Sequence, residues 1–250
     1  MNKKYQLNYS NLKPSMYMED ERIKKANKTV AVLRDYLNEV TELNLLDIGS
    51  STGIMTNEYA KYFKNVTGVD LDTTAIEYSI NQYKKDNLKF ICAPIEDAGI
   101  PKSSFDVITC SQIYEHVPSD KNLMEEIYRI LKPGGVCYFA AGNRFKIIEP
   151  HYKLPFLSFL PKKAANFYIR LFTNHDLYYE NLKSLRNLKK LVSNFEIIDY
   201  TLKIIKSPSR FSADDMLLEK TYKYYLFNAL AKFCYFIIPT YIWILKKPNI

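Results

Sequence analysis

The stretch LLDIGSSTG, residues 45–53, decides the fold, because it joins a short apolar strand to a turn that contains two glycines. Gly49 and Gly53 permit backbone conformations and a close ligand approach that a Cβ atom would block. The backbone N–H groups at the start of the next helix can face a carboxylate or a phosphate. Asp70 ends the next apolar stretch, where its carboxylate can accept hydrogen bonds from ribose hydroxyls. The pattern therefore predicts a strand–turn–helix unit that binds a nucleoside-type ligand.

The sequence around this turn alternates apolar strands with helical patterns, which is typical of βαβ units in a parallel sheet. The predicted strands cover residues 43–49, 65–72, 87–94, 105–113 and 135–142, and the helical patterns cover 52–63, 73–86 and 120–132. In the last helix, one face is formed by Leu123, Ile127, Ile130 and Leu131. The turn Pro133-Gly134-Gly135 is expected to end that helix. We therefore expect an α/β fold with a doubly wound, mostly parallel sheet.

The chain divides into four predicted parts by these patterns. They are an N-terminal helical cap (1–43), the cofactor-binding α/β core (44–142), a helical insertion on the substrate side (143–194) and a C-terminal part with the last two strands (195–250). The cap is expected to contain a mostly polar helix over 19–43. The late strands are expected at 195–205 and 239–247, with a helical segment over 212–236 between them. Helical insertions thus follow the fifth and sixth strands, where substrate choice usually resides.

Four motifs follow one another in the core. They are LLDIGSSTG (45–53), VTGVDLD (66–72), SFDVITCSQIYEHVPS (104–119) and ILKPGGVCYF (130–139). In this order they resemble the motifs of the class I S-adenosylmethionine-dependent methyltransferases, of the type 11 kind. The resemblance implies the Rossmann-like fold of that class and S-adenosylmethionine as the cofactor.

The resemblance also implies which residues bind the cofactor. The glycine-containing turn would surround the methionine part, Asp70 would hold the ribose and Leu71 would pack on the adenine. The full expected set is Asp47, Gly49, Ser50, Ser51, Gly53, Asp70, Leu71, Ile95, Glu96 and Ser111.

Two residues depart from the family's pattern. Ser51 stands where the family usually has its middle glycine, and Pro94 stands where many relatives have an acidic residue that contacts the adenine. The turn by itself is also compatible with a dinucleotide-binding enzyme. That class needs G-x-G-x-x-G with room for a pyrophosphate, whereas serines separate Gly49 from Gly53 here. The spacing favours the methyltransferase.

Two histidines are candidates for catalysis. Methyl transfer from a sulfonium mainly requires an aligned acceptor and the exclusion of water, and a general base helps when the acceptor is a hydroxyl. His151 begins the insertion beside Glu149 and Tyr152 and is the principal candidate for that base. His116 follows the fourth strand and is the second candidate. The alternatives are a loop histidine that caps or packs, and a histidine that shapes the pocket.

Cysteine spacing indicates no metal site. The four cysteines are widely spaced and form no CxxC pair, so neither disulfides nor a zinc site is predicted. The sequence MNKKYQLNYS at the N-terminus lacks the apolar run of a secretory signal. Together these features predict a cytoplasmic protein.

Positive charge is concentrated in the second part of the chain. Residues 151–250 contain 16 Lys and Arg against 7 Asp and Glu, whereas residues 1–150 contain 19 against 20. A basic, aromatic segment favours an anionic substrate or an acidic membrane surface, and the alternative is solvated lysines on helix surfaces. The apolar run 226–245 approaches transmembrane length, but Asn228, Lys232 and Pro239 interrupt it. A packed helix and strand, a peripheral contact through 212–247 at the inner face of the membrane, and a spanning segment therefore remain open.

The predicted function is methyl transfer from S-adenosylmethionine to a small-molecule, lipid or saccharide acceptor, with O-methylation favoured. The stretch EPHYKLPFLSFLP, residues 149–161, resembles a segment of methyltransferases that serve surface-polysaccharide and lipid synthesis, which favours such acceptors. A nucleic-acid methyltransferase is one alternative, but no NPPY-like motif or RNA-binding module supports a nucleic-acid partner. A non-catalytic S-adenosylmethionine-binding or scaffold protein is the other.

Overall fold

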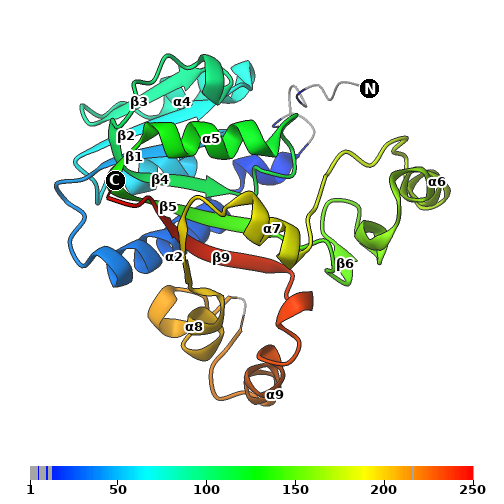
Figure 1. Cartoon of the computed structure of the whole chain (residues 1–250). Coiled ribbons are helices and arrows are strands. Elements are labelled where there is room, and N and C mark those ends of the chain that lie inside the picture. Colours follow the sequence, from blue (N-terminus) through cyan, green and yellow to red (C-terminus); the bar gives the residue numbers. More distant parts are fainter. Residues whose placement is uncertain (1–4, 6–9, 11–12, 216, 250) are drawn as a thin grey trace.

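A seven-stranded sheet organises the molecule (Figure 1). The computed structural model describes residues 5, 10, 13–215 and 217–249. The strand order is β3-β2-β1-β4-β5-β9-β8. Parts of the expected N-terminal cap (residues 1–4, 6–9 and 11–12), residue 216 of the expected helical segment and the last residue, 250, lie outside the described residues.

The five strands of the expected core are all parallel. They are β1 (Asn44–Ile48), β2 (Asn65–Asp70), β3 (Leu88–Cys92), β4 (Phe105–Ser111) and β5 (Leu131–Gly142). The two late strands are β8 (Glu196–Asp199) and β9 (Thr240–Lys246), and β9 runs antiparallel to both β5 and β8. A separate hairpin pairs β6 (Ile148–Glu149) with β7 (Leu154–Pro155). The expected doubly wound, mostly parallel sheet is confirmed.

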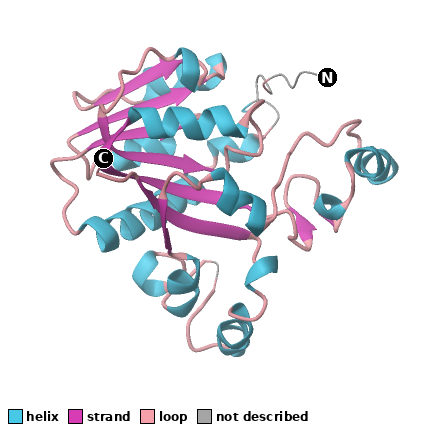
Figure 2. Ribbon diagram, viewed as in Figure 1, coloured by secondary structure: helices cyan, strands magenta, loops and turns pink. Residues whose placement is uncertain are grey.

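Helices cover both faces of this sheet, as Figure 2 shows. The helices that lie on the sheet are α2 (Glu19–Leu37), α3 (Ile54–Tyr59), α4 (Thr73–Gln82), α5 (Asp120–Ile130), α7 (Leu185–Leu191) and α8 (Thr201–Lys206). Two further helices, α6 (Lys162–Phe172) and α9 (Tyr222–Ala231), lie away from the sheet (Figure 1). Apolar side chains of α5 and α7 pack in one buried cluster, and those of α2, α3 and α8 pack in the other. Neighbouring strand residues alternate between the clusters: Leu45 packs with α2 and Leu46 with α5. Both faces are therefore buried, which explains why the strands are apolar throughout.

The position of β1 creates the crevice. The chain runs outward from β1 to β2 and β3, and then returns to place β4 on the other side of β1. Ile48, the last residue of β1, is in register with Val69 on one side and Cys110 on the other. The loops that follow β1 and β4 therefore leave the sheet in different directions, and a crevice opens between them.

Helix α5 ends at Ile130, two residues before the end of the predicted helical pattern over 120–132. Leu131 was expected on the helix but has extended backbone (φ −63°, ψ 136°) and begins β5, where it pairs with Phe105. The cause is Pro133, which cannot continue a helix and disfavours helical backbone in the residue before it.

The C-terminal predictions need two corrections. The strand expected over 195–205 covers only Glu196–Asp199, because the Asp199 carboxylate accepts a 2.8 Å hydrogen bond from the Thr201 amide and helix α8 begins there. The helical segment expected over 212–236 contains α9 and a short 3₁₀ turn (Tyr235–Ile237). The apolar run 226–245 is thus divided between an exposed helix and a buried strand. None of the helices among the described residues is both long and apolar enough to cross a membrane.

Strand β9 is expected to be critical for stability. Trp243 is fully buried, stacks on Tyr241 at a centroid distance of 5.5 Å and lies 6.3 Å from the ring of Phe139. We predict that Trp243→Ala lowers the free energy of unfolding by about 3 to 5 kcal/mol, because it leaves a large cavity in the core. Phe233→Ala is the control, since Phe233 is 83% exposed. Urea unfolding of both variants tests this, and equal losses would contradict it.

Candidate functional site

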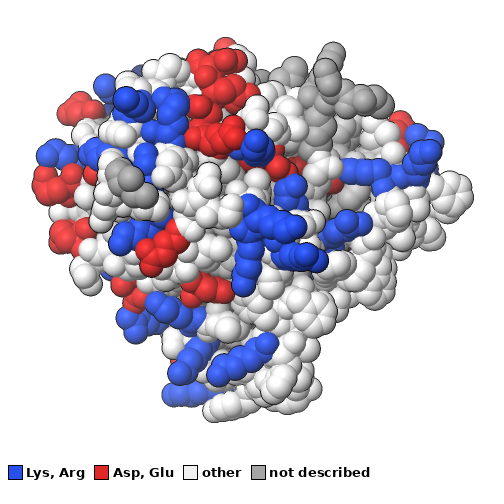
Figure 3. Space-filling view, viewed as in Figure 1, with Lys and Arg blue, Asp and Glu red and all other residues white. Residues whose placement is uncertain are grey.

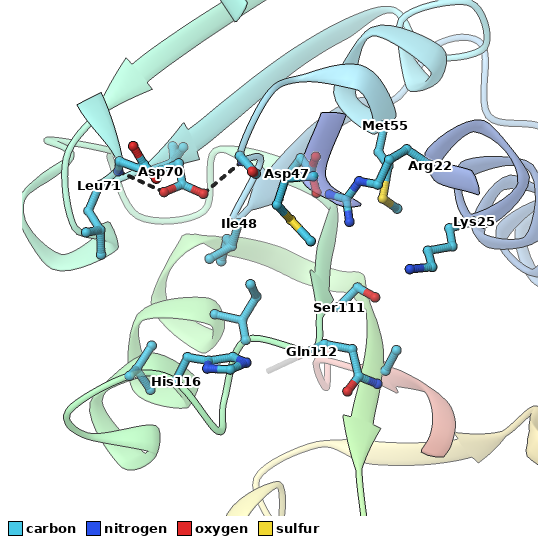
Figure 4. Close-up of a pocket in the computed structure, with 18 of the residues that line it drawn as sticks. Arg22, Lys25, Asp47, Ile48, Met55, Asp70, Leu71, Ser111, Gln112 and His116 are labelled. Atoms are coloured by element: carbon cyan, nitrogen blue, oxygen red, sulfur yellow. Dashed lines mark hydrogen bonds between the residues drawn. The ribbon is translucent and has the colours of Figure 1, made fainter. Parts of the chain in front are cut away.

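A pocket of about 580 Å³ lies at the carboxyl ends of β1 and β4 (Figure 4). The turn after β1 and the end of β2 form one wall, and helix α2 forms another. The loop after β4 and the start of the insertion, at Pro150 and His151, complete it. The pocket therefore occupies the crevice that the strand order creates, which is where α/β sheets bind ligands.

The turn after β1 is held by the neighbouring strand. The amides of Gly49 and Ser50 donate to the Val69 carbonyl at 2.8 and 3.2 Å. Gly49 and Gly53 have positive φ values of 77° and 74°, and a Cβ atom on Gly49 would lie 2.1 Å from the Ile113 side chain. Ser51 also has positive φ, 49°, although it carries a side chain. The serine therefore adopts the left-handed conformation that a glycine would reach without strain.

Asp70 fixes this conformation. One carboxylate oxygen accepts from the Ser51 amide at 2.8 Å and the other from the Asp72 amide at 2.9 Å. Burial raises the pKa of Asp70, while these backbone hydrogen bonds oppose the rise. Asp70 lines the pocket, so its remaining lone pairs can accept hydrogen bonds from a ligand's hydroxyl groups.

Asp47 is buried at the base of the turn. The hydroxyl groups of Thr56 and Thr109 donate to its two carboxylate oxygens at 2.7 and 2.6 Å. Burial raises the pKa of Asp47, and the two threonine hydrogen bonds lower it. These contacts tie the end of β1 to α3 and β4, so the turn has a rigid base.

The expected cofactor residues fall into two groups. Those that line the pocket are Asp47, Gly49, Ser51, Asp70, Leu71, Ile95 and Ser111. Those outside its lining are Ser50, Gly53 and Glu96. Gly53 lies behind the turn, where a Cβ atom would meet the Ser79 and Phe90 side chains at under 3 Å. Glu96 accepts a 2.5 Å hydrogen bond from the hydroxyl of Tyr5, which itself lines the pocket.

The two candidate histidines lie against each other in the pocket wall. His116 and His151 come from different segments, and their ring centroids are 5.3 Å apart in an edge-to-face arrangement. His151 Nδ1 lies 2.7 Å from Glu149 Oε1, and its backbone amide donates to Glu149 Oε2 at 2.7 Å. With a proton on Nδ1 donated to Glu149, His151 Nε2 is free to accept a proton.

Glu149 is suited to orient His151. Burial raises its pKa, but the hydrogen bond from His151 and the charges of His151 and Lys146 outweigh burial, so the pKa is lowered. Lys146 Nζ lies 3.5 Å from Glu149 Oε1. Glu149 is therefore ionised at neutral pH and can stabilise a protonated His151. Sequence spacing identified Glu149 as a neighbour of His151, but not this contact.

Two further glutamates lie behind the histidines. Glu180 Oε1 is 3.6 Å from His151 Nδ1, and burial raises the pKa of Glu180. Glu115 is fully buried, and neither of its carboxylate oxygens has a hydrogen-bond partner among the described residues. Burial raises the pKa of Glu115 to about 7. Both come from segments remote from residue 151, so the sequence gives no sign that they meet there.

Helix α2 contributes pocket residues that were not expected from the sequence. Arg22, Lys25 and Lys28 all line the pocket. Their spacing of three residues places them on one face of the helix, and this signal was available in the sequence. Among the described residues, no group of three His, Cys, Asp or Glu side chains is placed to hold a metal ion.

Comparison with known proteins identifies the core. A family model described as "Methyltransferase domain" matches residues 46–139. The chain is 32% identical over 103 residues to a ubiquinone biosynthesis O-methyltransferase of Coxiella burnetii, which covers 40% of this chain and 44% of that protein. The chain thus spans less than half of that curated relative's length.

Solved structures support the fold. The plantazolicin methyltransferase BpumL, solved with a monoazolic desmethylPZN analogue and SAH, is 21% identical, with a TM-score of 0.60 over 96% of this chain and 88% of its own. The [4+2]-cyclase SpnF is 16% identical, with a TM-score of 0.51 over 84% of this chain and 76% of its own. At these identities the likeness concerns the fold, and the fold accommodates more than one reaction.

The raised pKa of Glu115 predicts a pH-dependent stability. The unfolded chain releases this proton near the ordinary value of 4.5, whereas the folded protein holds it to about 7. The wild-type protein therefore loses stability as pH rises from about 4.5 to 7, by on the order of 3 kcal/mol. Glu115→Gln cannot ionise, so relative to wild type it should gain stability by that order between pH 4 and pH 8.

Chemical denaturation across this pH range measures the effect. Glu125→Gln is the control, because Glu125 is exposed on α5 and its pair with Lys121 contributes little. A Glu115→Gln variant whose stability follows wild type at every pH would contradict the burial argument.

Proposed function

We propose that the chain transfers a methyl group from S-adenosylmethionine to a hydroxyl oxygen of its acceptor, and the premise is the match of residues 46–139 to the methyltransferase-domain family model. The observation that carries the proposal is the arrangement of Asp70 and the turn after β1. The Asp70 carboxylate faces the pocket at the switch point of the sheet and holds Ser51 in its left-handed conformation. A nucleoside bound here would have its ribose hydroxyls near the Asp70 carboxylate, which can accept their hydrogen bonds. It would also lie close to the backbone of the turn after β1.

The lining supports a nucleoside cofactor with an amino-acid tail. Leu71, Pro94 and Ile95 offer apolar contact for an adenine beyond Asp70. Gly49 and Ser111 lie farther along the pocket, beside Asp47, where the methionine part would extend. When bound, S-adenosylmethionine supplies an electrophilic methyl group, and the residues of the chain have to align an acceptor with it.

His151 is proposed to accept the proton of the acceptor hydroxyl. Glu149 holds the imidazole through Nδ1, so Nε2 is the basic atom. Protonation of His151 places a positive charge beside the ionised Glu149, which stabilises it. His116 packs against the ring of His151 and limits its rotation. The curated relatives are named O-methyltransferases, which agrees with a hydroxyl acceptor.

The acceptor is proposed to be a small molecule, lipid or saccharide that reaches the pocket from the insertion side. The insertion carries exposed aromatic and aliphatic side chains on α6, among them Phe167, Leu171 and Phe172. It also supplies Pro150 and His151 to the pocket wall. The same segment therefore offers apolar contact outside the pocket and the proposed base within it.

We also propose that α9 contacts an anionic membrane surface. Tyr222, Tyr225 and Phe233 are between 63% and 83% exposed. Lys223 and Lys232 are also exposed, and Figure 3 shows basic side chains beside uncharged surface in this lower part of the molecule. An exposed aromatic helix with lysines suits the membrane interface. The contact expected over 212–247 excludes β9, because that strand is buried within the sheet.

The cofactor site is tested with S-adenosylhomocysteine. We predict that the wild-type protein binds it in calorimetry and that Asp70→Asn weakens binding about tenfold or more, because a charge-assisted hydrogen bond to the ribose is lost. The control is Asp86→Asn, since Asp86 is exposed after α4. Failure of the wild-type protein to bind would end the proposal, and binding without turnover on any acceptor would favour the scaffold alternative.

The general base is tested by methyl transfer. Labelled S-adenosylmethionine and a panel of phenols, sugars and lipids would identify an acceptor. We predict that His151→Gln then lowers kcat about a hundredfold while the affinity for S-adenosylhomocysteine changes little, because the base acts on the acceptor proton. His175→Gln, which alters an exposed histidine, should retain activity. Full activity of His151→Gln would exclude it as the base.

Membrane contact is tested by sedimentation with vesicles. We predict that the protein binds vesicles containing phosphatidylserine and that Tyr222→Ser with Phe233→Ser reduces binding, because exposed apolar contact is removed. Ile80→Ser is the matched control, since Ile80 is an exposed apolar residue on α4, which packs at the opposite edge of the sheet. Equal binding by all three proteins would contradict a role for α9.

A further inference from the structure

The α2 wall of the pocket is positively charged. Arg22, Lys25 and Lys28 follow one another at intervals of three residues and all line the pocket. Figure 4 shows Arg22 and Lys25 at the side of the pocket opposite Asp70 and Leu71. The end of the pocket away from the proposed nucleoside site therefore presents cationic side chains from a single helix.

The three cations differ in their partners. Lys28 is buried and pairs with Asp215, with an Nζ–Oδ1 distance of 3.4 Å. Arg22 and Lys25 form no ion pair among the described residues. The Nε of Arg22 is buried and has no hydrogen-bond partner there. Because an unpaired buried guanidinium nitrogen is costly, this atom indicates a missing acceptor of hydrogen bonds.

Repulsion among Arg22, Lys25 and Lys28 also indicates a missing anion. Desolvation and the neighbouring charge of Arg22 lower the pKa of Lys25, and Lys28 adds to this effect, whereas the carboxylates of Glu21 and Asp215 oppose it. Asp47 is near enough to Arg22 for the two charges to interact, but the carboxylate oxygens of Asp47 are already engaged by Thr56 and Thr109. Arg22 and Lys25 therefore repel each other at the pocket wall, and no carboxylate among the described residues forms an ion pair with either.

The proposed cofactor does not balance these charges. S-adenosylmethionine has one carboxylate, one ammonium and one sulfonium group, so it brings a net positive charge into the pocket. Its single carboxylate is offset by its own ammonium group, so the bound cofactor leaves the positive charge of Arg22 and Lys25 uncompensated beside a cationic donor. A further anion would relieve this repulsion, and in a methyltransferase pocket the acceptor is the molecule that can supply it.

We propose that the acceptor carries an anionic group, a carboxylate or a phosphate, that Arg22 and Lys25 bind at the α2 wall. This inference rests on the proposed methyl transfer, since it identifies the second ligand of the same pocket. A planar guanidinium and a flexible ammonium together suit either oxyanion, because Arg binds two oxygens at once and Lys acts as a point charge. The acceptor would thus be selected by its charge as well as by its hydroxyl.

Calorimetry on the protein saturated with S-adenosylhomocysteine tests the inference. The probes are 4-hydroxybenzoate, phenyl phosphate and neutral 4-hydroxybenzamide. We predict that at least one anion binds about tenfold or more tightly than the amide, and that Arg22→Gln and Lys25→Met each remove most of this preference. Lys24→Met is the matched control, because Lys24 neighbours Lys25 on the same helix, is exposed and does not line the pocket.

The outcomes separate the two ligands. An anion preference lost in both pocket variants and kept in Lys24→Met, with affinity for S-adenosylhomocysteine nearly unchanged, supports the inference. If the two variants instead lose affinity for S-adenosylhomocysteine but not for 5′-methylthioadenosine, which lacks the carboxylate, the cations serve the cofactor and the inference is wrong. It is equally wrong if neither anion binds more tightly than the amide. If the wild-type protein binds neither S-adenosylhomocysteine nor 5′-methylthioadenosine, the proposed function itself is wrong.

Discussion

The position of β1 between β2 and β4 is the constraint on which the rest of the structure depends. Because the chain reverses its direction of sheet growth at β1, the loops at the ends of β1 and β4 cannot close over each other. The crevice between them is therefore a product of strand order rather than of any one side chain. Asp47 ties the end of β1 to α3 and β4, and Asp70 shapes the turn. A rigid scaffold thus presents a backbone loop to a ligand.

The pKa values of the three buried glutamates depend on how far their partners offset the effect of burial. Burial disfavours the ionised forms of Glu115, Glu149 and Glu180, and the contacts with Lys146 and His151 outweigh this effect at Glu149 alone of the three. Glu149 remains ionised because it has both partners, whereas burial raises the pKa of Glu115 to about 7, and its oxygens have no hydrogen-bond partner among the described residues to oppose the rise. Such differences between neighbouring carboxyl groups are typical of sites where protons move.

Sequence reasoning predicted the parallel core well because its signals are local. Short apolar runs, such as the one before Gly49 and the one that ends at Asp70, indicate strands buried on both faces. The same reasoning failed where tertiary contacts decide. The stretch after Asp199 has an apolar pattern that suits a strand, but a side-chain hydrogen bond to Thr201 begins a helix instead. Residues 240–246 resemble part of a membrane segment by composition, but they form β9, which pairs with β5 on one side and with β8 on the other.

Some residues of the candidate site could be predicted from the sequence, and others could not. Asp47, Gly49 and Asp70 lie at or just after the carboxyl ends of β1 and β2, so their meeting at one end of the sheet follows from topology. The pairing of His116 with His151 depends on how the insertion folds back, and no sequence period reports it. The row at Arg22 and Lys25 has a helical period, but the sequence does not say which way that face points.

A crystal structure of the protein with S-adenosylhomocysteine tests the central claim most directly. The account predicts the ribose hydroxyls within hydrogen-bond distance of the Asp70 carboxylate, the adenine beside Leu71, and the homocysteine sulfur directed toward the side of the pocket formed by His116 and His151. A ligand bound elsewhere, or one in this pocket with its ribose away from Asp70, would contradict the account.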